Sequence, residues 1–172
     1  MLLWRPLLPS DLPALSAIAA AVHPGFPEED AVFAERQLLY PGGAMLLEKD
    51  GAPAGYVLSH PWRFGQLPAL NALLGKIPHD ADTYYLHDLA LLPAARGGGA
   101  AGKAVALLRD KARRAGFAHM SLVAVNGSQP FWTRHGFAVE ERPELAEKLA
   151  SYEAAARLMV HRFGLVKAGG AA

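Results

Sequence analysis

The chain has 172 residues, with 17 Lys and Arg against 16 Asp and Glu, a formal net charge of +1 and no Cys. This length predicts one domain, which buries roughly 70% of the surface of its unfolded chain. The near-neutral charge argues against a general nucleic-acid binder, because such binding needs a basic surface. The absence of Cys excludes disulfides, thiolate nucleophiles and Cys-ligated metal sites.

No apolar run approaches the ~18–20 residues that span a bilayer. Residues 15–22 imitate the core of a signal peptide, but Asp11 and Pro13 interrupt the approach to them. The His residues show no close metal-ligand spacing. We therefore expect a cytoplasmic protein that holds no metal and binds neither membrane nor nucleic acid.

In the first half of the chain, apolar patterns and turn signals predict strands and helices. The expected order is a strand at 2–7, a helix over 12–22, a second helix that starts at 28–30, two strands at 44–49 and 54–60 joined by a tight hairpin turn, a loop or short helix over 62–82, and a strand at 83–92.

The second half continues the alternation. It predicts a helix over 98–115, a strand at 121–125, a short helix at 129–134, a strand near 137–140, a loop or helical turn over 144–152 and a last strand at 158–163. Residues 167–172 form a tail that we expect to be disordered. With no repeat or boundary in view, the sequence predicts a single layered α/β (α+β) domain over residues 1–166.

Residues 86–103 run from a strand through a Gly-rich turn into a helix. Successive Gly residues let the backbone approach a ligand, and a helix start presents unpaired N–H groups and the positive end of its dipole. The first turn holds no acid, and Arg96 and Lys103 flank it. The N-terminal end of this helix can therefore bind an anion from outside the chain, and a diphosphate is the anion that fits it best.

Other nucleotide motifs fit this turn less well. A P-loop needs Ser or Thr after its Lys, but Ala104 follows Lys103. The spacing of a dinucleotide-binding fingerprint is present in Gly97, Gly99 and Gly102. However, no acidic residue lies at the end of the next strand, as that motif requires. A nicotinamide-dependent oxidoreductase is kept as a weaker alternative.

Two blocks resemble the GNAT superfamily of acyl-CoA-dependent N-acetyltransferases. Arg96, Gly99 and Ala101 match its Arg/Gln-x-x-Gly-x-Gly/Ala signature, which follows a strand and Pro93 as in the family. Residues 123–137 resemble its second block, a strand and a short helix with an aromatic-x-basic-x-Gly-Phe ending. The order of predicted elements is also similar across nearly the whole chain.

The resemblance implies a GNAT fold, with a central mixed, mostly antiparallel sheet flanked by helices, and acetyl-CoA as co-substrate. The pantetheine arm would pair with the strand backbone, where the N–H of Leu89 could polarise the thioester, and the helix start would hold the pyrophosphate. For the turn at 126–128, a simple turn and helix cap is an equal alternative. The cofactor-binding residues implied are Leu89, Ala90, Leu91, Arg96, Gly97, Gly98, Gly99, Ala100, Ala101, Gly102, Lys103, Asn126, Ser128, Phe131 and Trp132.

An amine acceptor needs a base, because an alkylammonium has a pKa of about 10.4. Regular alternation would place Tyr85, His87, Leu89 and Leu91 on one face of the strand, which the resemblance turns toward the acceptor. His87 is the candidate base, directly or through a water, against the alternative of a half-buried structural His. On a regular strand Asp88 would face the opposite side, tied to backbone donors; a bulge would reverse this.

The general acid is the open point. Family members often use a Tyr on the short helix of the second block, where this chain has Trp132, whose indole N–H cannot serve. A water, Tyr85, His135 or direct release of the thiolate are the alternatives.

We therefore predict an N-acetyltransferase that moves the acetyl group of acetyl-CoA to a primary amine of a small molecule or peptide by direct attack in a ternary complex. The alternative is a catalytically silent CoA-binding or partner-binding module of the same fold. A homodimer could form through the last strand and the segment before residue 83. The sequence does not identify the acceptor.

Overall fold

A computed structural model describes residues 1–164, which form one seven-stranded sheet in the order β1-β2-β3-β4-β5-β7-β6. The strands are β1 (Leu2–Pro6), β2 (Ala44–Lys49), β3 (Ala52–Trp62), β4 (Thr83–Leu91), β5 (His119–Ala124), β6 (Ala138–Val139) and β7 (Arg157–Arg162). The α-helices are α1 (Leu12–Val22), α2 (Asp30–Leu39), α3 (Ala100–Arg114), α4 (Gln129–Arg134) and α5 (Ala146–Ala150).

The predicted elements are confirmed in type and order, with shifts of a few residues at their ends. The region between β3 and β4 contains neither helix nor strand, so the loop interpretation of this segment is the correct one. The tail at 167–172 lies outside the described residues. No helix within residues 1–164 is long and apolar enough to cross a membrane.

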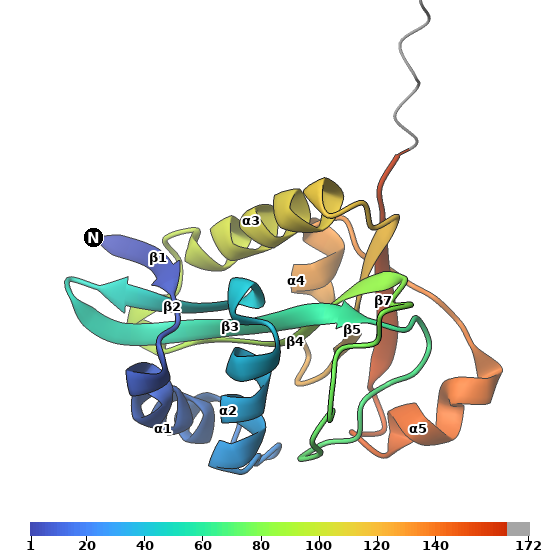
Figure 1. The fold of residues 1–172 in the computed structure, drawn as a ribbon, viewed down its shortest axis with the longest axis horizontal. Helices are drawn as coiled ribbons and strands as arrows, with labels where there is room; N and C mark the ends of the chain where they lie inside the picture. Colours follow the sequence, from blue (N-terminus) through green and yellow to red (C-terminus); the bar gives the residue numbers. More distant parts are fainter. Residues whose placement is uncertain (165–172) are drawn as a thin grey trace, which may run out of the picture.

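Helices cover both faces of the sheet, with α3 and α4 on one side and α1 and α2 on the other (Figure 1). The α3 side buries one large apolar cluster, which includes Val105 and Leu108 of the helix and Leu86 of β4. On the other side, Leu15 and Phe33 pack against β2 and β3. Burying both faces explains why apolar side chains predominate on both faces of the central strands.

The sheet opens between β4 and β5. These two strands are parallel, and they pair only through Tyr84 with Met120 and Tyr85 with Ser121. The other strand pairs are antiparallel. Beyond Tyr85, β4 continues to Leu91 with no strand partner on the β5 side within the described part of the chain, so a row of its backbone groups is left open.

A β-bulge lies at the start of this open stretch. Leu58 of β3 pairs with Asp88, but the next residue pairs with Leu86, so His87 is the extra residue on β4. One extra residue moves all later side chains to the other face of the sheet. The prediction that Leu89 and Leu91 share a face with Tyr85 is therefore wrong.

The bulge also overturns the prediction for Asp88. On a regular strand Asp88 would point away from His87, but here both side chains lie on the α1 and α2 side, where each meets a residue that precedes α2. Leu89 instead packs on the α3 side.

Candidate active site

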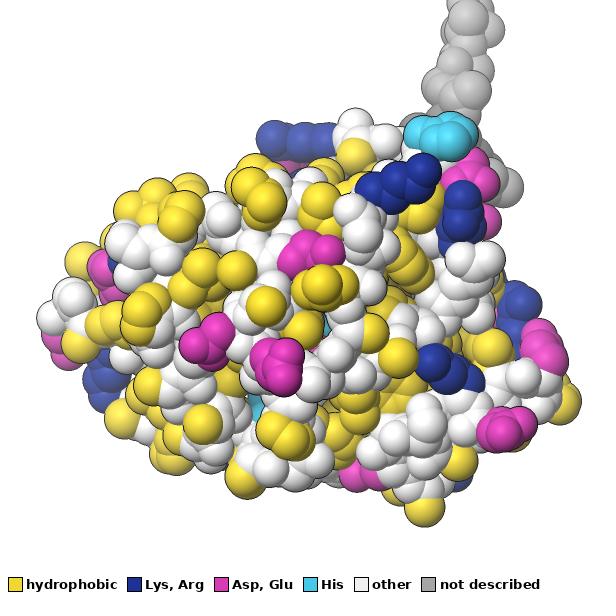
Figure 2. All heavy atoms as spheres, turned by 60° about the horizontal axis from the view of Figure 1, so that its bottom comes forward, with side chains coloured by type: hydrophobic (Ala, Val, Ile, Leu, Met, Phe, Trp, Pro, Cys, Tyr) yellow, Lys and Arg dark blue, Asp and Glu magenta, His cyan; other side chains and the backbone are white. Residues whose placement is uncertain are grey.

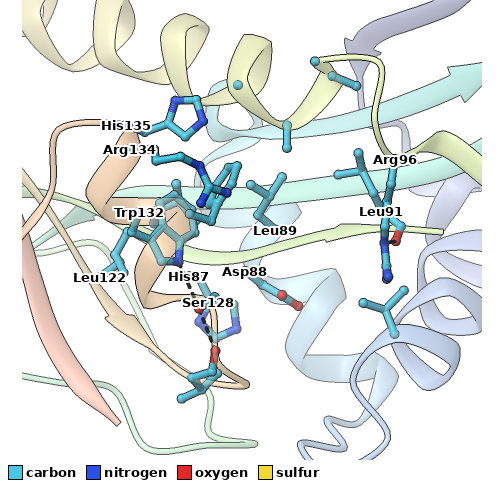
Figure 3. Close-up of a pocket in the computed structure, with 18 of the residues that line it drawn as sticks. His87, Asp88, Leu89, Leu91, Arg96, Leu122, Ser128, Trp132, Arg134 and His135 are labelled. Atoms are coloured by element: carbon cyan, nitrogen blue, oxygen red, sulfur yellow. Dashed lines mark hydrogen bonds between the residues drawn. The ribbon is translucent and has the colours of Figure 1, made fainter. Parts of the chain in front are cut away.

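A cleft of about 480 Å³ occupies the opening between β4 and β5 (Figure 3). Its walls come from the open stretch of β4, the Gly-rich turn, the start of α3, the end of β5 and α4. Most of the predicted cofactor residues line it: Leu89, Leu91, Arg96, Gly97, Gly99, Ala100, Ala101, Gly102, Ser128, Phe131 and Trp132.

Four of the predicted cofactor residues do not line this cleft. The side chain of Ala90 points to the opposite face, where it packs with the α1 and α2 cluster. Gly98 lies against the side chain of Leu2, and Lys103 is exposed on α3. The backbone N–H of Asn126 donates to Glu153 at 2.7 Å, and Asn126 is exposed in its turn.

The start of α3 has the features of an anion-binding site. Gly99, the N-cap, has φ of 77°, a left-handed conformation that is strained for residues with a Cβ. The first backbone bond of the helix runs from the N–H of Lys103 to the carbonyl of Gly99, so the preceding N–H groups have no acceptor in the helix. With no acidic residue in this turn, the positive dipole end faces the cleft.

Arg134 and His135, at the end of α4, line the same cleft. His135 packs on Gly102, since a Cβ there would lie 2.9 Å from its ring. Neither residue was predicted to bind the cofactor, although both stand in the second sequence block. Their role depends on α4 facing α3, which the order of residues does not show.

Trp132 and Ser128 form the wall of the cleft at α4. The indole of Trp132 is largely buried in the core, and its N–H donates to the hydroxyl of Ser128 at 3.2 Å. That hydroxyl in turn donates to the carbonyl of Val125 at 2.6 Å. Both groups are thus satisfied within the protein and neither is free to protonate a leaving group.

A second, smaller cavity of about 60 Å³ lies beside the cleft. The two cavities share His87, Asp88, Val123 and Val125 in their walls. The residues at the bulge of β4 therefore stand between a cleft that the sequence assigns to the acyl donor and a cavity suited to the acceptor.

His87 is held by Glu28, a residue that sequence reasoning missed. Its Nε2 lies 2.9 Å from a Glu28 carboxylate oxygen, and both side chains are more than 90% buried. Burial raises the pKa of Glu28, but the hydrogen bond to His87, the charge of His87 and the N–H of Asn71 together outweigh it, so the net shift is downward. In a neutral ring Nε2–H then donates to the carboxylate, and no group within residues 1–164 bonds to Nδ1.

Glu28 could be interpreted from sequence only as an acid near a helix start, because 59 positions separate it from His87. Its other carboxylate oxygen accepts the backbone N–H of Asn71 at 3.2 Å, in the loop before β4. Glu28 therefore connects the candidate base to the loop that covers the small cavity.

The carboxylate of Asp88 contacts side chains. The prediction that backbone N–H groups bind it is therefore wrong. One carboxylate oxygen lies 2.9 Å from Nε2 of His23, and the other accepts the hydroxyl of Tyr56. The His23 ring is not aligned for a regular hydrogen bond. Burial lowers the pKa of His23, but Asp88, with smaller contributions from Leu89 and Glu28, more than offsets this and the net shift is upward.

Tyr85, the other predicted catalytic residue, lines the small cavity together with His87. Burial raises its pKa well above the ordinary value of a tyrosine, with a further upward contribution from Tyr152. A phenol this weakly acidic is a poor proton donor at neutral pH. Across residues 1–164, no group of three or more His, Asp or Glu is placed to hold a metal ion.

Comparison with known proteins agrees with this geometry. The family model described as the acetyltransferase (GNAT) family matches residues 12–137. A search of curated proteins finds no match. Among solved structures, the GphF GNAT-like decarboxylase in complex with isobutyryl-CoA is similar, with a TM-score of 0.76 and 21% identity over 93% of this chain and 98% of that chain.

Two further structures share the fold. The loading GNATL domain of CurA from Lyngbya majuscula has a TM-score of 0.76 and 14% identity over 94% of this chain and 98% of that one. N-acetylglutamate synthase from Neisseria gonorrhoeae, complexed with coenzyme A and N-acetyl-glutamate, has a TM-score of 0.69 and 19% identity over 95% of this chain. The match spans only 35% of that synthase chain.

Proposed function

The chain belongs to the acetyltransferase (GNAT) family, and on that premise we propose that it transfers the acetyl group of acetyl-CoA to a primary amine by direct attack in a ternary complex. The observation that carries the proposal is the position of His87. Paired with Glu28, it forms part of the wall shared by the large cleft and the small cavity. A base in this wall can reach an acceptor on one side and a thioester on the other.

Acetyl-CoA would occupy the large cleft. Its pantetheine amides can pair with the open backbone of β4, as an added strand would. Its diphosphate would meet the free N–H groups at the start of α3, with Arg134 facing from α4. A cleft of about 480 Å³ is within the usual size of ligand sites.

The amine would enter from the small cavity as an ammonium. Nδ1 of His87, opposite the nitrogen that Glu28 holds, would accept its proton. The neutral nitrogen then attacks the thioester carbonyl carbon, and the C–S bond breaks with its electron pair moving to sulfur. His87 passes the first proton to water, the nitrogen loses its second proton to water, and the thiolate takes up one proton from water. The products are the amide, the CoA thiol and one released proton.

A dedicated acid is dispensable for this last step. A thiol with a pKa near ~8.5 leaves as a thiolate far more easily than an alkoxide or an amide would. The reaction therefore needs no acidic side chain at the position of Trp132, where the family often carries a Tyr.

We expect His87→Ala to lower the rate roughly 10²–10⁴-fold, because it removes the base while the cofactor cleft stays intact. Thiol release from acetyl-CoA with a panel of primary amines measures the rate, and His79→Ala, at an exposed position outside both cavities, is the matched control.

Unchanged activity of His87→Ala across the pH range would reject His87 as the base. Binding of acetyl-CoA without thiol release on any amine would instead support the silent-module alternative.

A further inference from the structure

We infer that the acceptor is a compact primary amine with an apolar substituent and without a carboxylate next to the amino group. The inference rests on the proposed function and adds the substrate class. It follows from the size, the charge and the rigid roof of the small cavity beside His87.

The first argument is size. A cavity of about 60 Å³ holds a few water-sized groups, enough for an amino group and a short alkyl segment. Apolar side chains, among them Phe26, Leu70 and Val123, make up much of its wall. An alkyl or aryl substituent would lose no hydrogen bonds on entering such a site, whereas a polar one would.

The second argument is charge. The charged or titratable side chains of this wall are two carboxylates, Glu28 and Asp88, two histidines, His23 and His87, and two tyrosines. Within the described part of the chain, neither Lys nor Arg lines the cavity. An ammonium group would be attracted to this wall, while a substrate carboxylate would lose its water beside two like charges.

Arg36 is a buried cation that interacts with the charged groups of this wall but does not line the cavity itself. Arg36 of α2 is only 2% exposed. Its two Nη atoms donate to the carbonyl of Ala72 at 3.2 Å, and one of them also lies 3.1 Å from the carboxylate of Glu35. Its Nε has no partner within residues 1–164, but Arg36 does not line the small cavity, so it is not placed to pair with the carboxylate of a free amino acid there.

The third argument is the roof. Pro68, Ala69 and Leu70 cover the cavity, and the loop that carries them is fixed at several points. The carbonyl of Pro68 accepts the hydroxyl of Tyr152, and the N–H of Asn71 donates to Glu28. A roof held on two sides resists the enlargement that a bulky polar acceptor would need.

The outer surface over α1 and α2 (Figure 2) also carries acidic side chains, as the wall of the small cavity does. Figure 2 shows this face, where acidic side chains lie near the middle and side chains of both charges lie toward the margins. An approaching cation would meet negative potential first, which favours an amine over an amino acid.

A matched trio of acceptors tests the inference: 3-methylbutylamine, L-leucinamide and L-leucine, which share one side chain. We expect kcat/KM for 3-methylbutylamine to exceed that for L-leucine at least about 100-fold, because like-charge contacts are strongly unfavourable. Intrinsic reactivity would give the opposite order, since an α-amino group is less basic and more of it is neutral at pH 8. Equal or better turnover of L-leucine would overturn the inference and leave the proposed function standing.

Calorimetry on the CoA-loaded protein separates the two proposals. Binding of 3-methylbutylamine but not of L-leucine, without turnover of acetyl-CoA, would support the inferred site and overturn the proposed function. Binding of L-leucine but not of the amine would overturn the inference whatever the activity.

A positive charge introduced into the wall gives a second test. Leu70→Arg places a cation at the roof, and we expect it to raise kcat/KM for L-leucine at least tenfold relative to the control Leu70→Met, with the affinity for CoA unchanged. An unaltered preference in the Arg variant would contradict the charge argument.

Discussion

His60 and His87 lie 6.5 Å apart, from ring centre to ring centre, yet their surroundings differ. Glu28 accepts a hydrogen bond from His87. The buried ring of His60 donates through Nδ1 to the carbonyl of Pro61, and its Nε2 has no partner within residues 1–164. Burial lowers the pKa of His60 to about 3, so at neutral pH this ring is an uncharged part of the core.

We predict that His60 makes the protein sensitive to acid. Its pKa of about 3 in the folded state lies below the unfolded value of 6.5, so the unfolded chain binds more protons between these limits. The stability contributed by the neutral ring is complete above pH 6.5 and decreases as the pH falls toward 3, by about 1.4 kcal/mol per pH unit.

Urea unfolding of the wild type and His60→Phe at pH 7.5 and 4.5 measures this. We expect the wild type to lose about 2–3 kcal/mol more than the variant over this range. Parallel pH curves for the two proteins would show that His60 is not the acid-sensitive group.

At the scale of elements, α3 carries a left-handed glycine at each end. Gly99 at the N-cap has φ of 77°, and Gly116 after the last turn has φ of 86°. A Cβ on either residue would meet no atom within 4 Å. The two positions therefore have the same conformational requirement, but only Gly99 faces the cleft.

This symmetry provides a matched pair of substitutions. We expect Gly99→Ala and Gly116→Ala each to lower the free energy of unfolding by about 1 kcal/mol, because Ala is strained in this conformation. Gly99→Ala alone should weaken CoA binding, by about tenfold if one hydrogen bond to the diphosphate is lost. Unfolding curves and calorimetry measure the two effects; equal CoA affinity in both variants would exclude Gly99 from the phosphate site.

At the scale of the whole molecule, the sheet opens between its two parallel strands, at the candidate site. β4 and β5 share only two residue pairs, and the cleft between them takes contributions from both halves of the fold. A ligand that bridges this opening supplies contacts that the protein lacks by itself. We therefore expect binding of CoA to stabilise the protein as a whole.

At a CoA concentration 100 times its Kd, the stabilisation would be about 2.7 kcal/mol, and Tm would rise by about 5–11 °C. A thermal melt with and without CoA measures this, with NADH as the control ligand. A shift with NADH and none with CoA would favour the dinucleotide interpretation of the Gly-rich turn.

The amino-acid sequence by itself determined the elements and the donor cleft. Apolar periodicity located the strands and helices, and the run from Arg96 to Gly102 predicted residues that line the large cleft, because both depend on residues that are neighbours in the chain. Even Asn126 and Lys103, which lie outside the cleft, were drawn from the correct segments. The family resemblance extended this local information to a mixed, mostly antiparallel sheet flanked by helices.

Only the tertiary structure showed the surroundings of His87 and the small cavity beside it. The bulge at His87 depends on how β3 and β4 pair, and no local pattern distinguished it from a regular strand. The partnership of His87 with Glu28 joins residues 59 positions apart, and the roof joins Pro68 to Tyr152 across 84 positions. Contacts of this kind arise when the chain folds back on itself, so their geometry is set by packing and not by sequence spacing.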